Sequence, residues 1–305
     1  MTPEEYAARQ AVISAAAARV VVQFGKFFLN PLLTLTEWLN FLALLFPEVK
    51  RLRDQSAELG REFYDSQRQL NHPELPNNAR LVEPYEFDWF ALNVDPVRKS
   101  VSAEGATEKS LEQLALSVVR EVENGGRKQI IHAVEEDDLL KEKIAREAGR
   151  PAQTETRLVR GWARVATGRE TCAWCLMLVS RGPVYLGADT AGLDLPDREA
   201  QKLIAAGEDV SEYMTQWHEG CDCKVVPVFD LKRWAGRDAS KRALALWNEA
   251  SSEAAGILQA NPDKKSYVKG KWIPTTLNRE AINTLRRRME RGEIDPSIWA
   301  AIQVA

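Results

Sequence analysis

Cysteine and histidine are scarce in this sequence, with four and three among 305 residues. Four cysteines are too few for the disulfide framework that stabilises small secreted domains. They occur as two tight pairs, a pattern typical of metal binding in a reducing compartment, although two short disulfides or buried thiols would fit the same spacing. The sequence therefore excludes a disulfide-rich fold and leaves the two pairs to be explained.

Long uninterrupted hydrophobic runs are also absent. Apolar residues are dense over residues 20–46, but Lys26, Pro31 and Glu37 interrupt them. A helix that spans a bilayer needs about 18 or more predominantly apolar residues in a row. The first residues lack the basic flank and cleavage pattern of a signal peptide. We therefore expect no membrane span, synthesis in the cytoplasm, and two helices that are buried or face a partner.

An excess of basic charge is missing from the chain as a whole, since its formal net charge is −3 and its pI is near 5.9. Overall charge thus gives no indication of nucleic-acid binding. Locally, residues 263–291 carry nine Lys or Arg against three acidic residues, with Tyr267 and Trp272 between them. This basic tail could contact DNA phosphates or an acidic protein surface, and a solvated helix face is the simpler alternative.

Helix signals dominate the first part of the chain. Thr2, Pro3 and Glu5 have the pattern of a capping box with proline in the first turn, which predicts a helix at the N-terminus. Apolar spacing predicts two further helices over residues 36–46 and 47–70. This part of the chain is therefore expected to form a helical hairpin or bundle.

A second helical stretch is predicted further along, because apolar residues recur at helical spacing over residues 111–134. Ser110 and Gln113 could cap its start. The run Asn124-Gly125-Gly126 predicts a break or kink within it.

The fold class that we expect is mainly α, with a small α+β module in the centre that zinc stabilises. The division that we predict is a helical region with a connector (1–96), a second helical region (97–152), a cysteine module (153–235), and a helix with the basic tail (236–305). Residues 71–96 contain four prolines and should form an extended connector that is held in place by Tyr85, Phe87, Trp89 and Phe90. The cysteine module should end in a strand at residues 224–229.

The four cysteines form two motifs, Cys172-x-x-Cys175 and, further on, His218-x-x-Cys221-x-Cys223. Two thiolates three residues apart can point the same way on a helical turn, and two thiolates two residues apart lie on one face of a strand. Zinc prefers four sulfur or imidazole ligands in a closed structural site. The motifs therefore predict one structural zinc ion, bound by the four cysteines or by three of them with His218.

A catalytic interpretation of the same residues stays open, because a cysteine beside a histidine can serve as nucleophile and base. Cys172 or Cys175 would then act with His218 and Asp222. A closed site with four ligands has no open position for a substrate water, so the structural interpretation implies folding energy rather than hydrolysis.

Several short motifs of the central module recur together in one known family. They are Trp162-Ala-Arg164, Thr167-Gly-Arg169-Glu170-Thr-Cys172-Ala-Trp-Cys175, Ser180-Arg-Gly182, and His218-x-x-Cys221-x-Cys223 followed by Val225-Val-Pro227-Val. With these motifs, residues 153–235 resemble the Mu F-like phage head morphogenesis or minor capsid proteins, in the type found in phages of actinobacteria.

That resemblance implies a virion component made in the host cytoplasm and present in few copies at the portal vertex or inner capsid. It would act during head assembly with the portal protein, the scaffold and the major capsid protein, and could leave with the DNA. Its apolar N-terminal helices would contact these partners. Genes at this position are also often labelled capsid maturation protease, so the alternative function is the processing of scaffold or coat protein.

Overall fold

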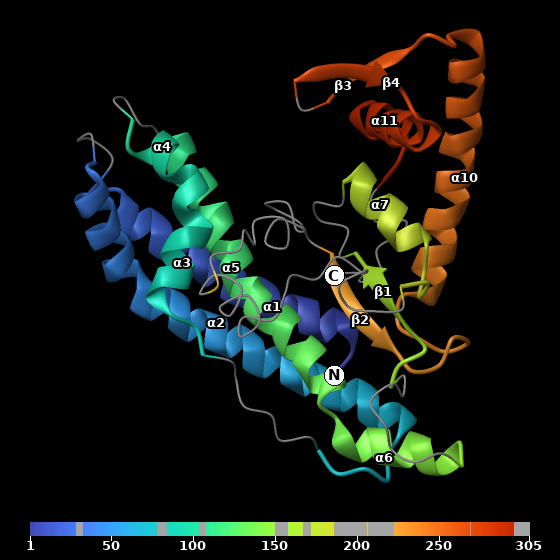
Figure 1. The fold of residues 1–305 in the computed structure, drawn as a ribbon, viewed down its shortest axis with the longest axis horizontal. Coiled ribbons are helices and arrows are strands. Elements are labelled where there is room, and N and C mark those ends of the chain that lie inside the picture. The colour runs from blue at the N-terminus through green and yellow to red at the C-terminus, as the bar shows by residue number, and fades with distance from the viewer. Residues whose placement is uncertain are drawn as a thin grey trace. The chain divides into compact units, whose positions relative to one another are not determined.

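The computed structural model describes residues 1–28, 33–77, 84–103, 108–149, 158–166, 172–185, 206, 223–268 and 270–295. The chain divides into two compact units. The helical unit comprises Met1–Arg160 with Gly187–Gly220, and the cysteine unit comprises Gly161–Leu186 with Cys221–Ala305. The described elements are mostly helices, accompanied by two small antiparallel sheets, so the fold is mainly α as the sequence predicts (Figure 1).

Three long helices form the body of the helical unit, and each packs against the other two (Figure 1). They are α1 (Pro3–Gly25), α2 (Leu35–Asn71) and α5 (Glu108–Glu135). Shorter helices accompany them: α3 (Phe87–Val94), the 3₁₀ turn η1 (Asp95–Val97), α4 (Arg98–Val101) and α6 (Asp138–Glu147).

The start of α1 confirms the predicted capping box. The Thr2 hydroxyl accepts a hydrogen bond from the Glu5 amide at 3.2 Å, and the Glu5 carboxylate accepts one from the Thr2 amide at 2.9 Å. Thr34 and Glu37 repeat the arrangement at the start of α2. These reciprocal bonds satisfy amides that have no partner within a helix, and so they fix where both helices begin.

The prediction of two helices separated at Pro47 is wrong, because α2 continues through this proline. Proline removes one backbone hydrogen bond, to the carbonyl four residues earlier, which belongs to Ala43. Ala43 and Pro47 are both exposed, so water can hydrate that carbonyl. Leu45 and Val49 on either side are fully buried, and their burial offsets the lost bond.

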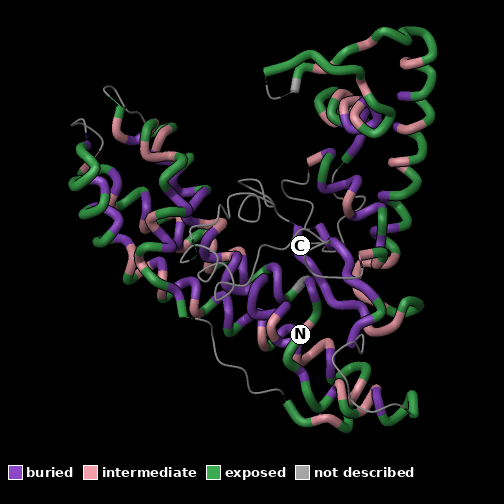
Figure 2. The backbone as a smooth tube through the Cα atoms, in the orientation of Figure 1, coloured by how far each residue is buried: buried purple, intermediate pink, exposed green. Residues whose placement is uncertain are grey.

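The dense apolar segment of residues 20–46 supplies part of the core of the helical unit. Several of its large side chains are almost inaccessible to solvent, namely Val21, Trp38, Phe41, Leu42 and Leu45. Figure 2 shows such buried positions, in purple, along the long helices of this unit. The helical unit thus covers by itself most of the apolar surface that could have faced a partner. The side chains from this segment that stay exposed include Phe27, Leu35, Leu39 and Leu44.

The aromatic residues that were expected to hold an extended connector instead form part of a helix, α3. Trp89 and Phe90 belong to it and are buried in the same core, and Tyr85 just before it is buried as well. The Phe46 ring stacks on Phe90, with their centroids 5.8 Å apart. Because these side chains are large and apolar, packing against α2 decides the local structure more than the nearby prolines do.

A buried carboxylate, Glu121, ties α5 to the segments that pack on it. It accepts hydrogen bonds from the Tyr85 hydroxyl at 2.9 Å and from the Asn93 amide at 2.7 Å. The guanidinium of Arg53 lies 4.0 Å from the centroid of the Tyr85 ring and donates to the Glu121 backbone carbonyl. Buried polar groups need such partners, so this network positions α3 against α2 and α5.

The predicted kink at Asn124-Gly125-Gly126 is also wrong, since α5 runs without interruption from Glu108 to Glu135. The glycines permit a close approach of α5 to α2 instead. A Cβ atom added at Gly60 would lie 2.5 Å from the Gly126 carbonyl oxygen, and one at Gly125 would lie 2.6 Å from the Arg53 carbonyl oxygen. The two backbones are therefore closer than any side chain would allow.

The cysteine unit contains a two-stranded antiparallel ladder of β1 (Gly161–Val165) and β2 (Lys224–Val228). The strand predicted before Phe229 is thus confirmed. Three helices accompany the ladder: α7 (Ala173–Ser180), α10 (Arg237–Ala260) and α11 (Leu277–Glu290), with α7 and α11 packed on α10. Buried alanines of α10, such as Ala243 and Ala250, permit this close packing.

The basic tail is an ordered part of the fold rather than a simple extension. A hairpin of β3 (Lys265–Val268) and β4 (Lys271–Pro274) precedes α11. Glu280 of α11 is fully buried and accepts hydrogen bonds from the Lys264 amino group at 2.8 Å and the Arg287 guanidinium at 3.0 Å. This carboxylate therefore links the base of the hairpin to the helix.

The Glu280 contacts predict a pH-dependent contribution to stability. Burial acts to raise the pKa of Glu280, but the hydrogen bonds and charges of Lys264 and Arg287 outweigh it, so the pKa is lowered from its ordinary value of 4.5. The stabilising contribution is therefore present above pH 4.5 and is lost as the pH falls through the lowered pKa. Glu280→Gln should cost about 1–3 kcal/mol at pH 7.

Urea unfolding across pH checks this prediction. The stability difference between wild type and Glu280→Gln should be largest at neutral pH and should shrink in acid. Glu290→Gln is the matched control, because Glu290 is an exposed residue of the same helix. A difference that stays constant across the acid range would show that the Glu280 charge contributes nothing.

Among the residues that the structure describes, no helix combines the length and the apolar character needed to cross a membrane.

Candidate functional site

The Cys172-x-x-Cys175 motif forms a tight turn at the start of α7. Cys172 is the N-cap residue, with φ −82° and ψ 167°, and its sulfur accepts a hydrogen bond from the Cys175 amide at 3.4 Å. Cys175 is buried in the first turn, whereas Cys172 is partly accessible. The amide donor and the positive end of the helix dipole both favour negative charge on the Cys172 sulfur, as a metal-binding thiolate requires.

Strand pairing brings a third cysteine into the same module. Cys223 directly precedes β2 and is fully buried. β2 pairs with β1 so that Lys224 lies opposite Val165, and α7 in turn packs against β1. Cys172, Cys175 and Cys223 are thiols and not disulfides. The Cys172-x-x-Cys175 pair is thus not one of the short disulfides that its spacing would also have allowed.

Tyr185 is a residue of this module that sequence reasoning missed. Its carbonyl accepts a hydrogen bond from the Trp162 amide at 2.7 Å, which attaches it to β1. Burial raises the pKa of the Tyr185 hydroxyl, the charges of Arg181 and Arg164 lower it, and the negative charge of Cys223 raises it further. Tyr185 thus lies within electrostatic range of Cys223, and no short motif would have indicated it.

The Tyr185 hydroxyl is a buried donor, and within the described residues it has no hydrogen-bond partner. A buried hydroxyl without a partner is costly, and metal-bound thiolates readily accept hydrogen bonds from such donors. The Cys223 sulfur does not accept a hydrogen bond from it in this structure, so a thiolate ligand near Tyr185 remains part of the zinc prediction.

The other half of the predicted ligand set, His218 and Cys221, lies outside the described residues, as does Asp222 of the catalytic alternative. Over the described ranges, no three His, Cys, Asp or Glu side chains are grouped closely enough to hold a metal ion. Cys172, Cys175 and Cys223 all lie within these ranges, so the described residues show the Cys-x-x-Cys turn but not a group of ligands around one metal position, and the zinc site stays a prediction.

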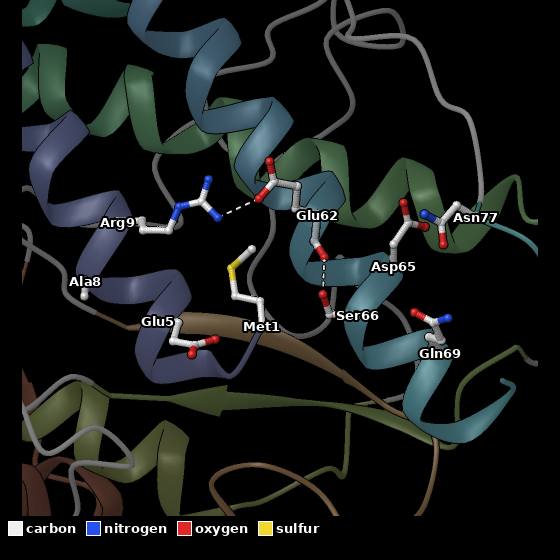
Figure 3. A pocket seen from close by; sticks show the side chains of 9 residues that line it. All are labelled: Met1, Glu5, Ala8, Arg9, Glu62, Asp65, Ser66, Gln69 and Asn77. Atoms are coloured by element: carbon white, nitrogen blue, oxygen red, sulfur yellow. Dashed lines mark hydrogen bonds and ion pairs between the residues drawn. The ribbon is translucent and has the colours of Figure 1, made fainter.

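A groove lies in the helical unit, between the start of α1 and the C-terminal half of α2. Figure 3 shows this groove of about 710 Å³, which is lined by Met1, Glu5, Ala8, Arg9, Glu62, Asp65, Ser66, Gln69 and Asn77. The Arg9 guanidinium pairs with the Glu62 carboxylate at 2.6 Å across it, and the Ser66 hydroxyl donates to the Glu62 carbonyl at 2.7 Å.

The chemistry of this groove does not indicate catalysis. Its lining contains no cysteine or histidine, and its serine hydroxyl is engaged in a bond to the backbone. The Arg9–Glu62 pair is about half exposed on both sides, so it contributes about 1 kcal/mol at most. The groove is a polar surface feature that joins two helices.

Comparison with known proteins shows that this is a bacteriophage protein. It is 44% identical over 297 residues to the Gene 15 protein of Mycobacterium phage D29, covering 95% of this chain and 99% of that protein. It is 45% identical over 316 residues to the Gene 15 protein of Mycobacterium phage L5, covering 98% of this chain and 99% of that protein.

A family model described as VG15 protein matches residues 1–250, and the chain belongs to that family. No solved structure matches it. These findings support the phage origin that the motifs imply. They do not name Mu F-like proteins or head morphogenesis, so that finer resemblance stays a prediction.

Proposed function

We propose that this protein is a minor capsid or head morphogenesis protein that acts at the portal vertex or inner capsid during head assembly. The observation that carries the proposal is the similarity to phage proteins along nearly the full chain, which includes both units. The Mu F-like motifs of the cysteine unit favour head assembly among phage functions. The partners in this proposal are the portal protein, the scaffold and the major capsid protein.

Zinc is the cofactor that we propose for the cysteine unit, with Cys172, Cys175, Cys221 and Cys223 as ligands and His218 as the competing candidate. A bound zinc ion supplies folding energy by joining segments that are distant in sequence. Cys175 and Cys223 are almost completely buried, which suits structural ligands and hinders attack on a protein substrate. Burial thus argues against Cys175 as a nucleophile, while Cys172, which is partly accessible, is the candidate that the catalytic alternative keeps.

We expect the purified protein to contain about one zinc ion per chain, because a closed site of this kind binds tightly. Cys175→Ser should lose the metal and the native structure of the cysteine unit. His218→Ala should be milder if four thiolates suffice. Elemental analysis and thermal unfolding with and without a chelator measure both effects.

The matched control for His218→Ala is His72→Ala, since His72 lies in the helical unit and should leave the zinc content unchanged. A natively folded sample without metal would refute the zinc proposal. His218 would belong among the ligands if His218→Ala lowered the zinc content and the thermal stability as much as Cys175→Ser and Cys221→Ser do.

Co-expression with the portal, scaffold and major capsid proteins of the same phage tests the proposed function. We expect the protein to copurify with assembled heads, and heads made without it to be fewer or malformed. A capsid maturation protease would behave differently: folded Cys172→Ser or His218→Ala variants would join the particles but leave scaffold or coat protein uncleaved.

The exposed apolar side chains just after α1 and at the start of α2 are the part of the helical unit that we propose contacts a capsid partner. Phe27, Leu35 and Leu39 can be changed to serine without opening the core, whereas removal of residues 1–46 would delete core residues such as Phe41. The triple variant should stay folded and fail to join heads. Leu70→Ser is the control, since Leu70 is exposed at the other end of α2.

A further inference from the structure

The β3–β4 hairpin presents two large aromatic rings to solvent. Tyr267 and Trp272 lie directly opposite each other in the antiparallel register, and their ring centroids are 5.4 Å apart. The two side chains are 64% and 67% exposed, and Figure 2 draws most of the hairpin as exposed. A pair that served only to stabilise the hairpin would be expected to bury more of its surface.

The alternation of side chains along a strand places Lys265 and Pro274 on the same face as these rings. Both residues are exposed. On the opposite face, the Ser266 hydroxyl is hydrogen bonded to the Thr275 hydroxyl at 2.7 Å, and Ile273 is less exposed than either ring. The aromatic face is therefore the more open of the two.

The charge around this face is positive. Residues 264–279 contain five Lys or Arg and no acidic residue. The nearest acidic residue after them, Glu280, is buried and balanced by Lys264 and Arg287. Lys265 and Lys271 are exposed on the strands themselves. Lys265 lies on the face of the two rings, whereas Lys271 lies on the opposite face with Ile273. An anionic partner would therefore meet the Lys265 charge beside the two rings, without an opposing carboxylate on the hairpin.

We propose that this hairpin binds single-stranded nucleic acid, with bases stacked on Tyr267 and Trp272 and a phosphate held by Lys265, the lysine on the same face as the rings. Exposed rings beside lysines are the combination that such binding uses, because every base has a face that can stack. A duplex hides those faces within its own stack. An acidic protein surface could also contact Lys265 and the rings, so competition by polyglutamate separates the two kinds of partner. The inference does not depend on the proposed role in head assembly.

Fluorescence anisotropy of the full-length protein with a labelled single-stranded oligonucleotide tests the proposal. Tyr267→Ala/Trp272→Ala should weaken binding at least about tenfold, because each stacked base contributes substantially to affinity. Lys265→Gln should reduce the slope of log K against log salt by about 0.7, since each phosphate contact on a single strand contributes about 0.7. Trp272→Phe keeps a ring and should bind nearly as wild type does.

Matched controls come from the helical unit. Phe27→Ala removes a more exposed ring, and Lys99→Gln removes an exposed charge, so neither should change affinity or salt slope. No binding by the wild type, wild-type binding by a folded Tyr267→Ala/Trp272→Ala variant, or equal binding of a duplex would overturn the proposal. Competition by polyglutamate as effective as that by unlabelled oligonucleotide would assign the surface to an acidic protein instead.

Discussion

Replacement of Asp137 by alanine is expected to lower the free energy of unfolding of the helical unit by about 3–5 kcal/mol, the cost of leaving a buried charge without its partner. Asp137 is 1% exposed and pairs with Arg68, which is 2% exposed. It also accepts a hydrogen bond from the Tyr64 hydroxyl at 2.6 Å and caps α6 by accepting one from the Leu140 amide at 3.0 Å. One side chain thus joins α2 to α6.

Tyr64 and Arg68, which both contact Asp137, cannot easily find other partners when Asp137 is replaced. Burial raises the pKa of Tyr64 far above its ordinary value, and the hydrogen bond to Asp137 adds to the effect, so the hydroxyl stays protonated as a donor. Arg68 also donates to the Pro76 carbonyl at 2.6 Å, which limits its movement toward water. Without Asp137, both donors would remain buried and the guanidinium charge would be uncompensated.

Asp138→Ala is the matched control, because it removes the next carboxylate along the chain. Asp138 is 80% exposed and pairs only at the surface with Lys141, so its loss should cost about 1 kcal/mol or less. Urea unfolding followed by circular dichroism compares the two variants. Equal effects of Asp137→Ala and Asp138→Ala would mean that the buried cluster does not stabilise the fold.

Local signals in the sequence predicted local features well. Thr2 with Glu5 located the start of α1, since a capping box depends only on residues three apart. The apolar run Val225-Val-Pro227-Val correctly indicated a strand, β2. The cysteine motifs indicated the turn at α7 for the same reason, because the spacing of Cys172 and Cys175 is contained within one helical turn.

Features that depend on distant contacts were not predictable in this way. Pro47 was expected to end a helix, yet packing of its buried neighbours on other segments keeps α2 continuous. The basic tail was expected to be a solvated helix face or a surface for phosphates or an acidic protein, but part of it is a hairpin. Glu280 anchors this hairpin to α11 through Lys264, 16 residues before it, and Arg287, 7 residues after it. Tyr185 approaches Cys223 only because strand pairing brings the segments together.

Gly60→Ala is the second substitution for which we expect a large loss, about 1–3 kcal/mol in the free energy of unfolding, because overpacking strains a close contact. The added Cβ would meet the Gly126 carbonyl oxygen at 2.5 Å and its Cα at 3.0 Å. Both are backbone atoms, so no side chain can rotate away, and α2 and α5 would have to separate. The buried residues that pack between these helices would lose contacts as a result.

Gly256→Ala is the matched control, since Gly256 lies in α10 and a Cβ added there has nothing within 4 Å. Alanine is the better helix former, so this variant should gain about 0.5–1 kcal/mol. The same chemical change should therefore act in opposite directions at the two positions, as urea unfolding of each variant would show. A stabilised Gly60→Ala protein would mean that the helices can separate at little cost, and that the Gly125-Gly126 run in α5 has a role other than the close crossing with α2.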